Sequence, residues 1–406
     1  MLKHINKSIA NGQVQAPPSK SYAHRLLIGA ALCQNDVTVE NIELSNDITA
    51  TIKCIESLGK KVIYDEASRT ITITKGSTEN NLFDCNESGS TLRFFIPIVL
   101  ALKQKGLFVG TKRLMERGLG IYEDIFNTIG IKYEKSLESI EVSGKLIPYR
   151  YLVKGNISSQ FITGLLFSLP LLDGDSIIEI IPPLESVNYI LITLDVLKQF
   201  GIKIDADLEN NIIQIKGNQT YSGSKFIVEG DYSNAAFLDV YNYIGGNVKV
   251  FGLNENSLQG DKVYKKYFDI LNSEDSPIID IKDSIDLGPI LFVFAAIKNG
   301  ATITGTKRLA IKESNRIVDV LTELAKFGVT FEIEEDQVKI NKCILHKPTE
   351  TLNSHNDHRI TMSLVAILSI FGGDIDGTNS VNKSYPTYFN TIKDLGIEVD
   401  DDDIDR

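Results

Sequence analysis

A helix start that carries two cations sets the pattern for the chain, and it reads Pro17-Pro18-Ser19-Lys20-Ser21-Tyr22-Ala23-His24-Arg25. The two prolines keep the backbone extended, and an apolar run over 26–32 follows. Ser19 or Ser21 is therefore the predicted N-cap. Lys20 and Arg25 then lie near the positive end of a helix, where cations are unfavourable unless an anion lies among them. The stretch is either a pair of solvated charges or part of an anion site.

Apolar helices with similar starts recur along the chain at intervals of 68, 70, 74, 53 and 71 residues. The six predicted starts lie near Ser21, Gly89, Ser159, Ser233, Asp286 and Asp357. Each helix is apolar nearly all round, which is typical of helices enclosed by other elements. The pattern therefore indicates six copies of one unit, of which one is shortened.

A second series of markers runs in step with the first, because a glycine or asparagine between apolar residues ends a second helix in each copy. The markers are Gly59, Gly130, Gly201, Gly328 and Gly396, with Asn272 as a degenerate sixth. Gly and Asn tolerate the left-handed conformation that commonly ends a helix. Short strand patterns follow, for example over 71–74 and 212–215. We therefore expect each copy to be a βαβαββ repeat.

Six such repeats predict an α/β protein of two similar domains, each with three repeats and with parallel helices buried inside sheets. A length of 406 residues also favours two domains. We expect one domain over 17–228 and the other over 1–16 plus 229–406, because the last repeat lacks a closing strand that the N-terminal strand could supply. A six-bladed or solenoid arrangement fits less well, since repeats of about 70 residues are long for a solenoid.

Composition and charge argue against several classes of function. The net charge of −11 argues against a nucleic-acid partner. No apolar stretch reaches membrane-spanning length and the N-terminus has no apolar signal region, so we expect no membrane association. The four cysteines are scattered without metal-ligand spacing, which predicts reduced thiols, a cytoplasmic location and no metal. Neither a GxSxG nor an HExxH motif is present.

Basic residues gather at or near these helix starts and in nearby loops, beyond what capping requires. Besides Lys20 and Arg25 they are Arg93, Arg117, Lys312, Arg316, Arg359 and Lys383. Lys312 and Arg316 are expected four residues apart on one helix, where they repel unless an anion or Glu313 lies between them. Helix N-termini facing one cleft would add free N–H groups and dipoles to these cations. We therefore expect small anionic ligands.

Seven motifs in this order resemble the enolpyruvyl transferase family, and within it the 5-enolpyruvylshikimate-3-phosphate synthases, over essentially the whole chain. They are Ser19–Arg25, Glu87–Arg93, Ser158–Phe161, Asp286–Pro289, Arg308–Arg316, Asn356–Arg359 and Lys383–Pro386. The resemblance implies an inside-out α/β barrel in each of two domains, with the active site in the cleft between them. It also implies a monomer without a cofactor.

The reaction implied by the resemblance joins phosphoenolpyruvate to the 5-hydroxyl of shikimate 3-phosphate and releases phosphate through a tetrahedral intermediate. Addition needs a proton on the methylene carbon while the hydroxyl attacks the neighbouring carbon, and elimination reverses the proton flow. Asp286 is the expected base near the hydroxyl, and Glu313 or Lys20 the expected acid. The same groups could exchange roles between the two steps.

The resemblance also divides the binding residues between the two substrates. The shikimate 3-phosphate set is Lys20, Ser21, Arg25, Ser158, Ser159, Gln160, Ser186, Tyr189, Asp286 and Lys312. The phosphoenolpyruvate set is Lys20, Gly89, Arg117, Gln160, Arg316, Arg359 and Lys383. Arginine suits such anions through bidentate contacts. Arg93 is as well explained as a structural residue paired to an acid. The small Gly89 suggests that glyphosate competes with phosphoenolpyruvate.

Three alternatives remain. The sister enzymes that use UDP-N-acetylglucosamine usually carry a reactive cysteine near the position of Arg117, but no cysteine lies between Cys85 and Cys343 here. A nucleic-acid-end-processing protein built on similar repeats is disfavoured by the net acidity and by the lack of an aromatic and basic stripe. A binding module without catalysis is the weakest alternative, because Lys20, Asp286 and Glu313 are all present.

Overall fold

The computed structural model describes residues 1–77 and 80–401, and the chain divides into two compact units. The first unit is Pro18–Glu229, and the second unit combines Met1–Pro17 with Gly230–Arg406. These ends lie one residue from the boundaries expected from the repeats. No helix among the described residues has the length and apolar character needed to span a membrane.

Three repeats of similar topology build the first unit. Each has a buried helix, a partly exposed helix and a four-stranded sheet with one parallel and two antiparallel pairings. The buried helices are α1 (Lys20–Leu32), α3 (Gly89–Leu102) and α6 (Ser159–Ser168), and the others are α2 (Asn46–Ser57), the short α4 (Lys112–Glu116), α5 (Gly120–Ile129) and α7 (Val187–Gln199).

The sheets of the first unit have the orders β14-β3-β5-β4, β6-β7-β9-β8 and β10-β11-β13-β12. Their strands are β3 (Val37–Glu40), β4 (Lys60–Asp65), β5 (Thr70–Lys75), β6 (Leu82–Asp84), β7 (Lys105–Val109), β8 (Lys132–Lys135), β9 (Ser139–Ser143), β10 (Arg150–Lys154), β11 (Ser176–Ile181), β12 (Ile204–Asp207), β13 (Ile212–Ile215) and β14 (Lys225–Ile227).

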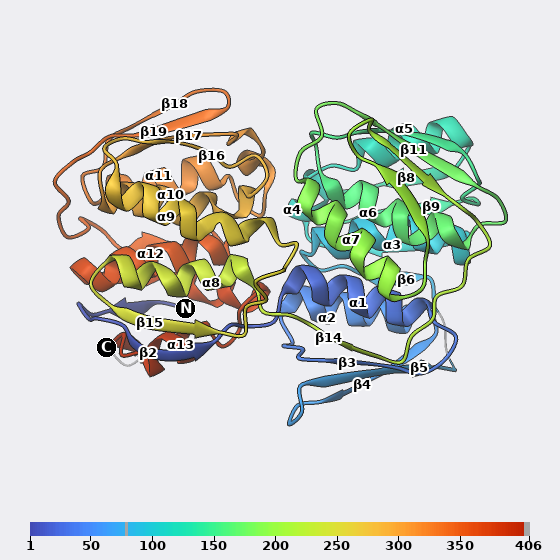
Figure 1. The fold of residues 1–406 in the computed structure, drawn as a ribbon, viewed down its shortest axis with the longest axis horizontal. Helices are drawn as coiled ribbons and strands as arrows, with labels where there is room; N and C mark the ends of the chain where they lie inside the picture. Colours follow the sequence, from blue (N-terminus) through green and yellow to red (C-terminus); the bar gives the residue numbers. More distant parts are fainter. Residues whose placement is uncertain (78–79, 402–406) are drawn as a thin grey trace. The chain divides into compact units, whose positions relative to one another are not determined.

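The second unit is built in the same way around its own core. Its buried helices α8 (Tyr232–Asp239), α10 (Gly288–Ile297) and α12 (His358–Phe371) lie side by side (Figure 1). Helices α9 (Tyr264–Ser273), α11 (Arg316–Ala325) and α13 (Tyr388–Asp394) follow them in the three repeats. The prediction of an α/β protein with helices inside sheets is therefore confirmed for each unit.

The sheets of the second unit have the orders β15-β2, β16-β17-β19-β18 and β20-β21-β1-β22. Their strands are β1 (Lys3–Ile5), β2 (Asn11–Gln15), β15 (Asn247–Phe251), β16 (Ile278–Asp280), β17 (Ala301–Thr304), β18 (Phe331–Ile333), β19 (Gln337–Ile340), β20 (Leu352–Asn353), β21 (Gly373–Asp376) and β22 (Val399–Asp401).

Exchanged edge strands explain why the chain passes between the units twice. Strand β2 precedes α1 in sequence but pairs in parallel with β15 of the second unit. Strand β14 precedes α8 but pairs in parallel with β3 of the first unit. Strand β1 pairs with both β21 and β22. It is the third strand of its sheet, a position that is taken in the other four-stranded sheets by the second strand of a hairpin, such as β13.

The fourth repeat differs from the expected βαβαββ unit because it has no hairpin after α9, and its sheet has two strands. The shortened interval of 53 residues reflects this loss. Asn272 was the expected helix-ending residue, but this prediction is wrong since Asn272 lies inside α9, which ends at Ser273. The five glycine markers are confirmed, with φ between 77° and 94°.

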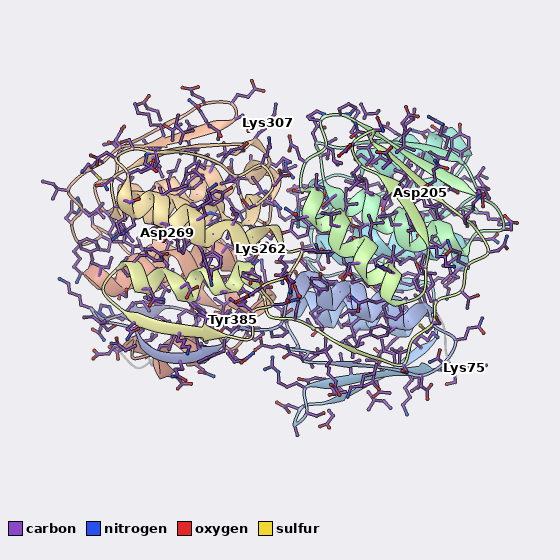
Figure 2. All side chains as sticks on the ribbon, viewed as in Figure 1. Lys75, Asp205, Lys262, Asp269, Lys307 and Tyr385 are labelled. Carbon is purple, nitrogen blue, oxygen red and sulfur yellow. The ribbon has the colours of Figure 1, made fainter. Side chains whose placement is uncertain are left out.

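Side-chain burial follows the layers within each unit. Charged residues such as Lys75, Asp205 and Lys307 are exposed on or beside outer strands, whereas Tyr385 is buried (Figure 2). Polar side chains are buried along the inner helices, but the arginines buried in them, Arg25, Arg93 and Arg359, all lie within the first two turns. Several of the predicted site residues lie at the starts of these helices, among them Lys20, Gly89 and Arg359.

Candidate active site

Short polar side chains cap five of the six buried helices. Ser19, Ser88, Ser158, Asp231 and Asp357 each accept a hydrogen bond from a backbone N–H of the first turn. This identifies Ser19, rather than Ser21, as the first N-cap. Asp286 caps no helix through its side chain, since it lies in the 3-10 helix η4 (Ile285–Leu287) before α10. Its carboxylate is thus available for other contacts.

Lys20 opens α1 and forms an ion pair with Asp47 of α2, with 2.7 Å between Nζ and Oδ2. Both side chains are largely shielded from solvent, with exposed fractions of 17% and 14%. One turn later His24 is buried, and its pKa lies well below the ordinary range because of burial and the nearby Lys20 and Arg25. His24 therefore stays neutral and adds no charge to the cations at this helix start.

Arg25 is buried and held by neutral partners. It donates to the Thr193 hydroxyl (2.8 Å) and to the Ser21 carbonyl (2.8 Å). The Tyr189 carbonyl is a third acceptor at 3.2 Å, and the Tyr189 ring centroid lies 6.0 Å from the guanidinium. Burial lowers the pKa of Arg25 to about 10, so the side chain remains a cation at neutral pH. Since these partners are all neutral, they do not neutralise the positive charge of Arg25.

Ser186 begins α7 in the left-handed conformation, with φ 56° and a buried side chain. Non-glycine residues rarely adopt this conformation, and when they do the position is often functional. The strand β11 and helix α7 flank it, so the residue is fixed at a sharp connection. The structure thus brings Ser186, Tyr189 and Arg25 into one region of the first unit.

At the first turn of α6, Ser158 caps the helix, Ser159 is buried, and Gln160 joins two helices. Gln160 accepts from Arg93 at 2.6 Å and donates to Ser90 at 2.9 Å. Arg93 also donates to the carbonyls of Arg117 and Gly118, both at 3.3 Å. These contacts link α3 to α6 and to the loop after α4, which is a structural role, but the acid expected as the partner of Arg93 is not among them.

Gly89, the first residue of α3, lies against Arg117. A Cβ atom at this position would be 3.1 Å from Nη1 of Arg117 and 3.2 Å from its Cζ. Arg117 follows α4 as its C-cap. The absence of a side chain at Gly89 therefore leaves room for the Arg117 guanidinium beside the start of a buried helix.

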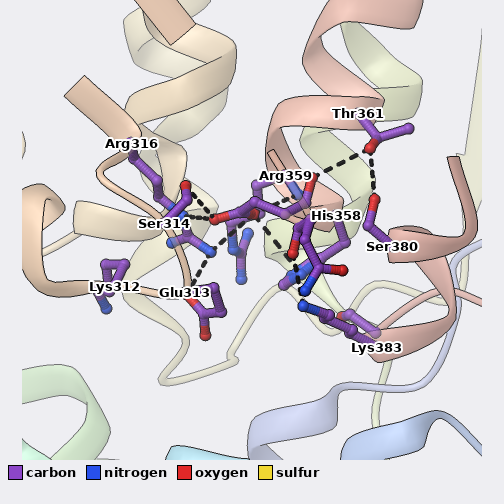
Figure 3. Close-up of polar contacts among 12 residues, drawn as sticks. Lys312, Glu313, Ser314, Arg316, His358, Arg359, Thr361, Ser380 and Lys383 are labelled. Atoms are coloured by element: carbon purple, nitrogen blue, oxygen red, sulfur yellow. Dashed lines mark hydrogen bonds and ion pairs between the residues drawn. The ribbon is translucent and has the colours of Figure 1, made fainter. Parts of the chain in front are cut away.

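In the second unit, Arg316 is buried among three carboxylates (Figure 3). Its guanidinium lies 2.8 Å from Asp286, Glu313 and Asp357. These carboxylates raise the pKa of Arg316 although burial opposes the charged form. Arg316 thus holds the two predicted catalytic carboxylates of this unit, the expected base Asp286 and the expected acid Glu313, on one guanidinium.

Lys312 and Arg359 contact the same Asp286 carboxylate. Lys312 Nζ lies 3.2 Å from Oδ1, and Arg359 Nη2 lies 3.3 Å from Oδ2. Burial lowers the pKa of Lys312, and the attraction of Asp286 opposes this shift. Lys383, at the end of the 3-10 helix η6 (Thr378–Lys383), donates to the Asn356 carbonyl at 2.6 Å. Three predicted cations therefore surround the Asp286 carboxylate, and Lys383 is held by the residue just before Asp357.

One prediction about this cluster is wrong in its local structure. Lys312 and Arg316 do not lie on one helix, since Lys312 follows the 3-10 helix η5 (Lys307–Ile311) and Arg316 begins α11. The intervening loop, Glu313–Asn315, lets both cations reach the Asp286 carboxylate. The Asp286 carboxylate lies near both cations and Glu313 pairs with Arg316, so these carboxylates relieve the repulsion, and Glu313 was one of the two partners expected to do so.

Sequence reasoning missed three acidic residues that shape these clusters, namely Asp47, Asp261 and Asp357. Asp357 caps α12 and also binds Arg316, so its capping position concealed its second contact. Asp261 accepts a hydrogen bond from Ser233 and is buried. Burial, followed by the charge of Asp286, raises the pKa of Asp261 to about 7, and Arg359 opposes this. The signal available in the sequence for Asp357 was an acidic residue at the start of a helix that was itself expected to be buried.

Chemically, the second unit combines a fixed carboxylate pair with several cations, which suits proton transfer beside a bound anion. The first unit offers serine-capped helix starts and charged Lys20 and Arg25, which suits a phosphate or carboxylate. Among the described residues, no group of three or more His, Cys, Asp or Glu side chains could hold a metal ion.

Comparison with known proteins agrees with the motifs. Residues 6–392 match the family model of EPSP synthase (3-phosphoshikimate 1-carboxyvinyltransferase). The chain is similar to the 3-phosphoshikimate 1-carboxyvinyltransferases of Clostridium novyi, at 40% identity over 98% of both chains, and Clostridium acetobutylicum, at 41% over 97% of both. Its fold is similar to that of an EPSP synthase from Acinetobacter baumannii, with a TM-score of 0.79 and 21% identity. The match covers 98% of this chain and 99% of the other. The chain therefore belongs to the EPSP synthase family.

Proposed function

We propose that this protein is a 3-phosphoshikimate 1-carboxyvinyltransferase. It transfers the enolpyruvyl group of phosphoenolpyruvate to the 5-hydroxyl of shikimate 3-phosphate and releases phosphate, a step of the shikimate pathway in aromatic amino acid biosynthesis. The match to the family model over residues 6–392 carries this conclusion. Relatives of that name at about 40% identity support it over the alternative acceptor UDP-N-acetylglucosamine.

The first unit supplies most contacts to shikimate 3-phosphate in this proposal. Arg25 supports the assignment because it is a buried cation with neutral partners, which suits a substrate anion. The hydroxyls of Ser21, Ser159 and Ser186 stand at or near helix starts, where phosphate is favoured. The remaining proposed contacts are from Lys20, Ser158, Gln160, Tyr189, Asp286 and Lys312.

Phosphoenolpyruvate is proposed to bind through cations of both units. Arg117 beside Gly89 contributes from the first unit, and Arg316, Arg359 and Lys383 contribute from the second. Lys20 and Gln160 complete the set. Because Arg316 also holds three carboxylates, its main effect is to orient Asp286 and Glu313 around the bound anion. The active site is then shared by the two units, which requires them to close around the substrates.

The proposed mechanism uses Asp286 as the base at the 5-hydroxyl of shikimate 3-phosphate. As the hydroxyl oxygen bonds to C2 of phosphoenolpyruvate, Glu313 or Lys20 delivers a proton to C3, which gives a tetrahedral intermediate. Removal of a proton from C3 then expels phosphate and restores the enol double bond. The cations near Asp286 and Glu313 stabilise the carboxylate and phosphate charge of both steps. Competition by glyphosate, a monomeric state and a cytoplasmic location belong to the same proposal.

Phosphate release from phosphoenolpyruvate and shikimate 3-phosphate tests the assigned roles. Lys20→Met and Asp286→Asn should each reduce kcat by at least about 100-fold, the usual contribution of a group that transfers protons. Lys53→Met is the control for Lys20→Met, because Lys53 pairs with Asp84 at 3.0 Å on an exposed surface. Unchanged turnover in Lys20→Met or Asp286→Asn, with native folding by circular dichroism, would remove that residue from the mechanism.

A further inference from the structure

A turn with two consecutive left-handed residues carries the carbonyl that holds Lys383. His355 and Asn356 have φ of 50° and 53°, a left-handed conformation that few residues other than glycine, asparagine, aspartate and histidine adopt. Asn356 presents its carbonyl oxygen to Lys383 Nζ at 2.6 Å. The next residue, Asp357, caps α12 and binds Arg316. The shape of the turn over 353–356 therefore decides where two groups of the proposed site lie.

Helix α11 fastens this turn through Glu323, whose side chain is 2% exposed. One carboxylate oxygen of Glu323 accepts from His355 Nε2 at 2.8 Å. The other accepts from the backbone N–H of Asn353 at 2.9 Å and from Lys326 Nζ at 2.8 Å. A single buried carboxylate thus holds both the first residue of the turn and the His355 ring.

The His355 ring lies between two carboxylates of α11. Nε2 faces Glu323, and Nδ1 lies 3.5 Å from Asp319 Oδ1. Either form of the ring can donate from Nε2 to Glu323, but only the imidazolium cation also forms an ion pair with Asp319. The geometry therefore favours the charged form of His355.

The groups around His355 together raise the pKa of its imidazole. The hydrogen bond from His355 to Glu323 raises the pKa of the imidazole, burial and the charge of Lys326 oppose the shift, and Asp319 adds to it. A raised pKa in the folded state means that the cation persists above its ordinary value of about 6.5. We call the contacts of His355 with Glu323 and Asp319 the His355 clamp. The clamp is complete at low pH and weakens as pH rises through the raised pKa of His355.

We propose that His355 is a positioning residue that holds the turn over 353–356 against α11 and thereby places Lys383 for phosphoenolpyruvate. The inference rests on the proposed function for its ligand, but the clamp itself consists of contacts within the second unit. His355 touches neither substrate in this account. Its effect passes through the Asn356 carbonyl to the Lys383 ammonium.

The test compares the KM for phosphoenolpyruvate between pH 6 and 9, at saturating shikimate 3-phosphate, in three variants. His355→Asn tolerates the left-handed backbone but carries no charge. It should raise KM at pH 6.5 on the order of tenfold, the loss of about one charge-assisted hydrogen bond, with a smaller effect on kcat. His355→Lys keeps a cation throughout this range, so its KM should not rise between pH 6 and pH 9. His346→Gln is the control, because His346 is exposed and its ring contacts the carbonyl of the adjacent Lys347.

The native protein and His346→Gln should show KM rising with pH, whereas His355→Asn should show a high KM that changes less. A His355→Asn variant with the native KM and pH profile overturns the inference, while phosphate release by the native protein still supports the proposed function. An NMR titration of the imidazole protons provides a readout without substrate. His355 should titrate above about pH 6.5, and lower in Asp319→Asn. Titration at its ordinary value would contradict the clamp.

Discussion

Asp357 shows how one side chain can serve both a helix and a charge cluster. It caps α12 through the N–H of Arg359 at 2.9 Å, and it accepts from Ser314 at 3.1 Å and from Arg316 at 2.8 Å. Arg316 itself is about 1% exposed. Removal of the carboxylate charge would leave a buried guanidinium with weaker compensation.

We expect Asp357→Asn to lower the free energy of unfolding by about 3 kcal/mol, as is usual when one partner of a buried ion pair is lost. Urea unfolding followed by circular dichroism measures this change. Asp175→Asn is the control, because Asp175 pairs with Lys216 at 2.6 Å but is 58% exposed. Its loss should change stability far less, since solvent screens an exposed pair. Equal effects of the two variants would contradict the buried role of Asp357.

Gly89→Ala tests the close approach of Arg117 to α3. The new methyl group would meet the guanidinium at 3.1 Å, and the flexible Arg117 side chain would move away. We expect the KM for phosphoenolpyruvate to rise on the order of tenfold, since small misplacements of a binding group are costly. Gly120→Ala is the control, because a Cβ there meets nothing within 4 Å. A native KM in Gly89→Ala would argue against a role for Arg117 in binding.

Asp261 provides a prediction about pH and stability. Its raised pKa, about 7, means that the folded protein binds a proton that the unfolded chain has already released, so stability declines as pH rises from about 4 to 7. Asp261→Asn should remove this part of the decline, at most about 4 kcal/mol. Urea unfolding at pH 5 and pH 8 measures it. An unchanged difference between the two pH values would contradict the buried, protonated Asp261.

At the scale of elements, the helix-ending glycines allow two costs of a glycine-to-alanine substitution to be separated. One is the cost of a left-handed backbone, and the other is the cost of a steric clash. Gly130 has φ 77° and open space where a methyl group would lie, whereas a Cβ at Gly328 would lie 2.8 Å from the His346 ring. Gly130→Ala should therefore cost about 1 kcal/mol from the left-handed backbone alone. Gly328→Ala should cost more. Thermal unfolding of both variants, with Gly130→Asn as a milder substitution, checks this order.

Helix starts and ends could be predicted because their signals are local. Serine and aspartate caps and the left-handed glycines each depend on a few neighbouring residues. The missing hairpin of the fourth repeat was visible only as a short interval, and the marker at Asn272 was misassigned as a result. The loop between Lys312 and Arg316 was mistaken for helix because its charges are paired with Asp286, which lies far away in sequence.

At the scale of the whole molecule, the repeats predicted two groups of three with residues 1–16 in the second group, but the parallel pairing of β2 with β15 and of β14 with β3 could not be predicted. Strands β2 and β14 are short, and nothing in their sequences specifies β15 and β3 as partners. The carboxylates that surround Arg316 come from three separate segments, so their meeting depends on the complete packing of the second unit. The cations were predicted mainly as ligands of an anion, and of the carboxylates around Arg316 only Glu313 was indicated by the sequence, whereas Asp286 and Asp357 were not.

We propose that the charged clusters of the two units act on phosphoenolpyruvate and shikimate 3-phosphate. The most direct measurement is the release of phosphate from phosphoenolpyruvate with shikimate 3-phosphate as acceptor, compared with UDP-N-acetylglucosamine and with no acceptor. The account predicts release only with shikimate 3-phosphate, together with one enolpyruvyl product per phosphate. Absence of release with shikimate 3-phosphate, or release with UDP-N-acetylglucosamine alone, would contradict it.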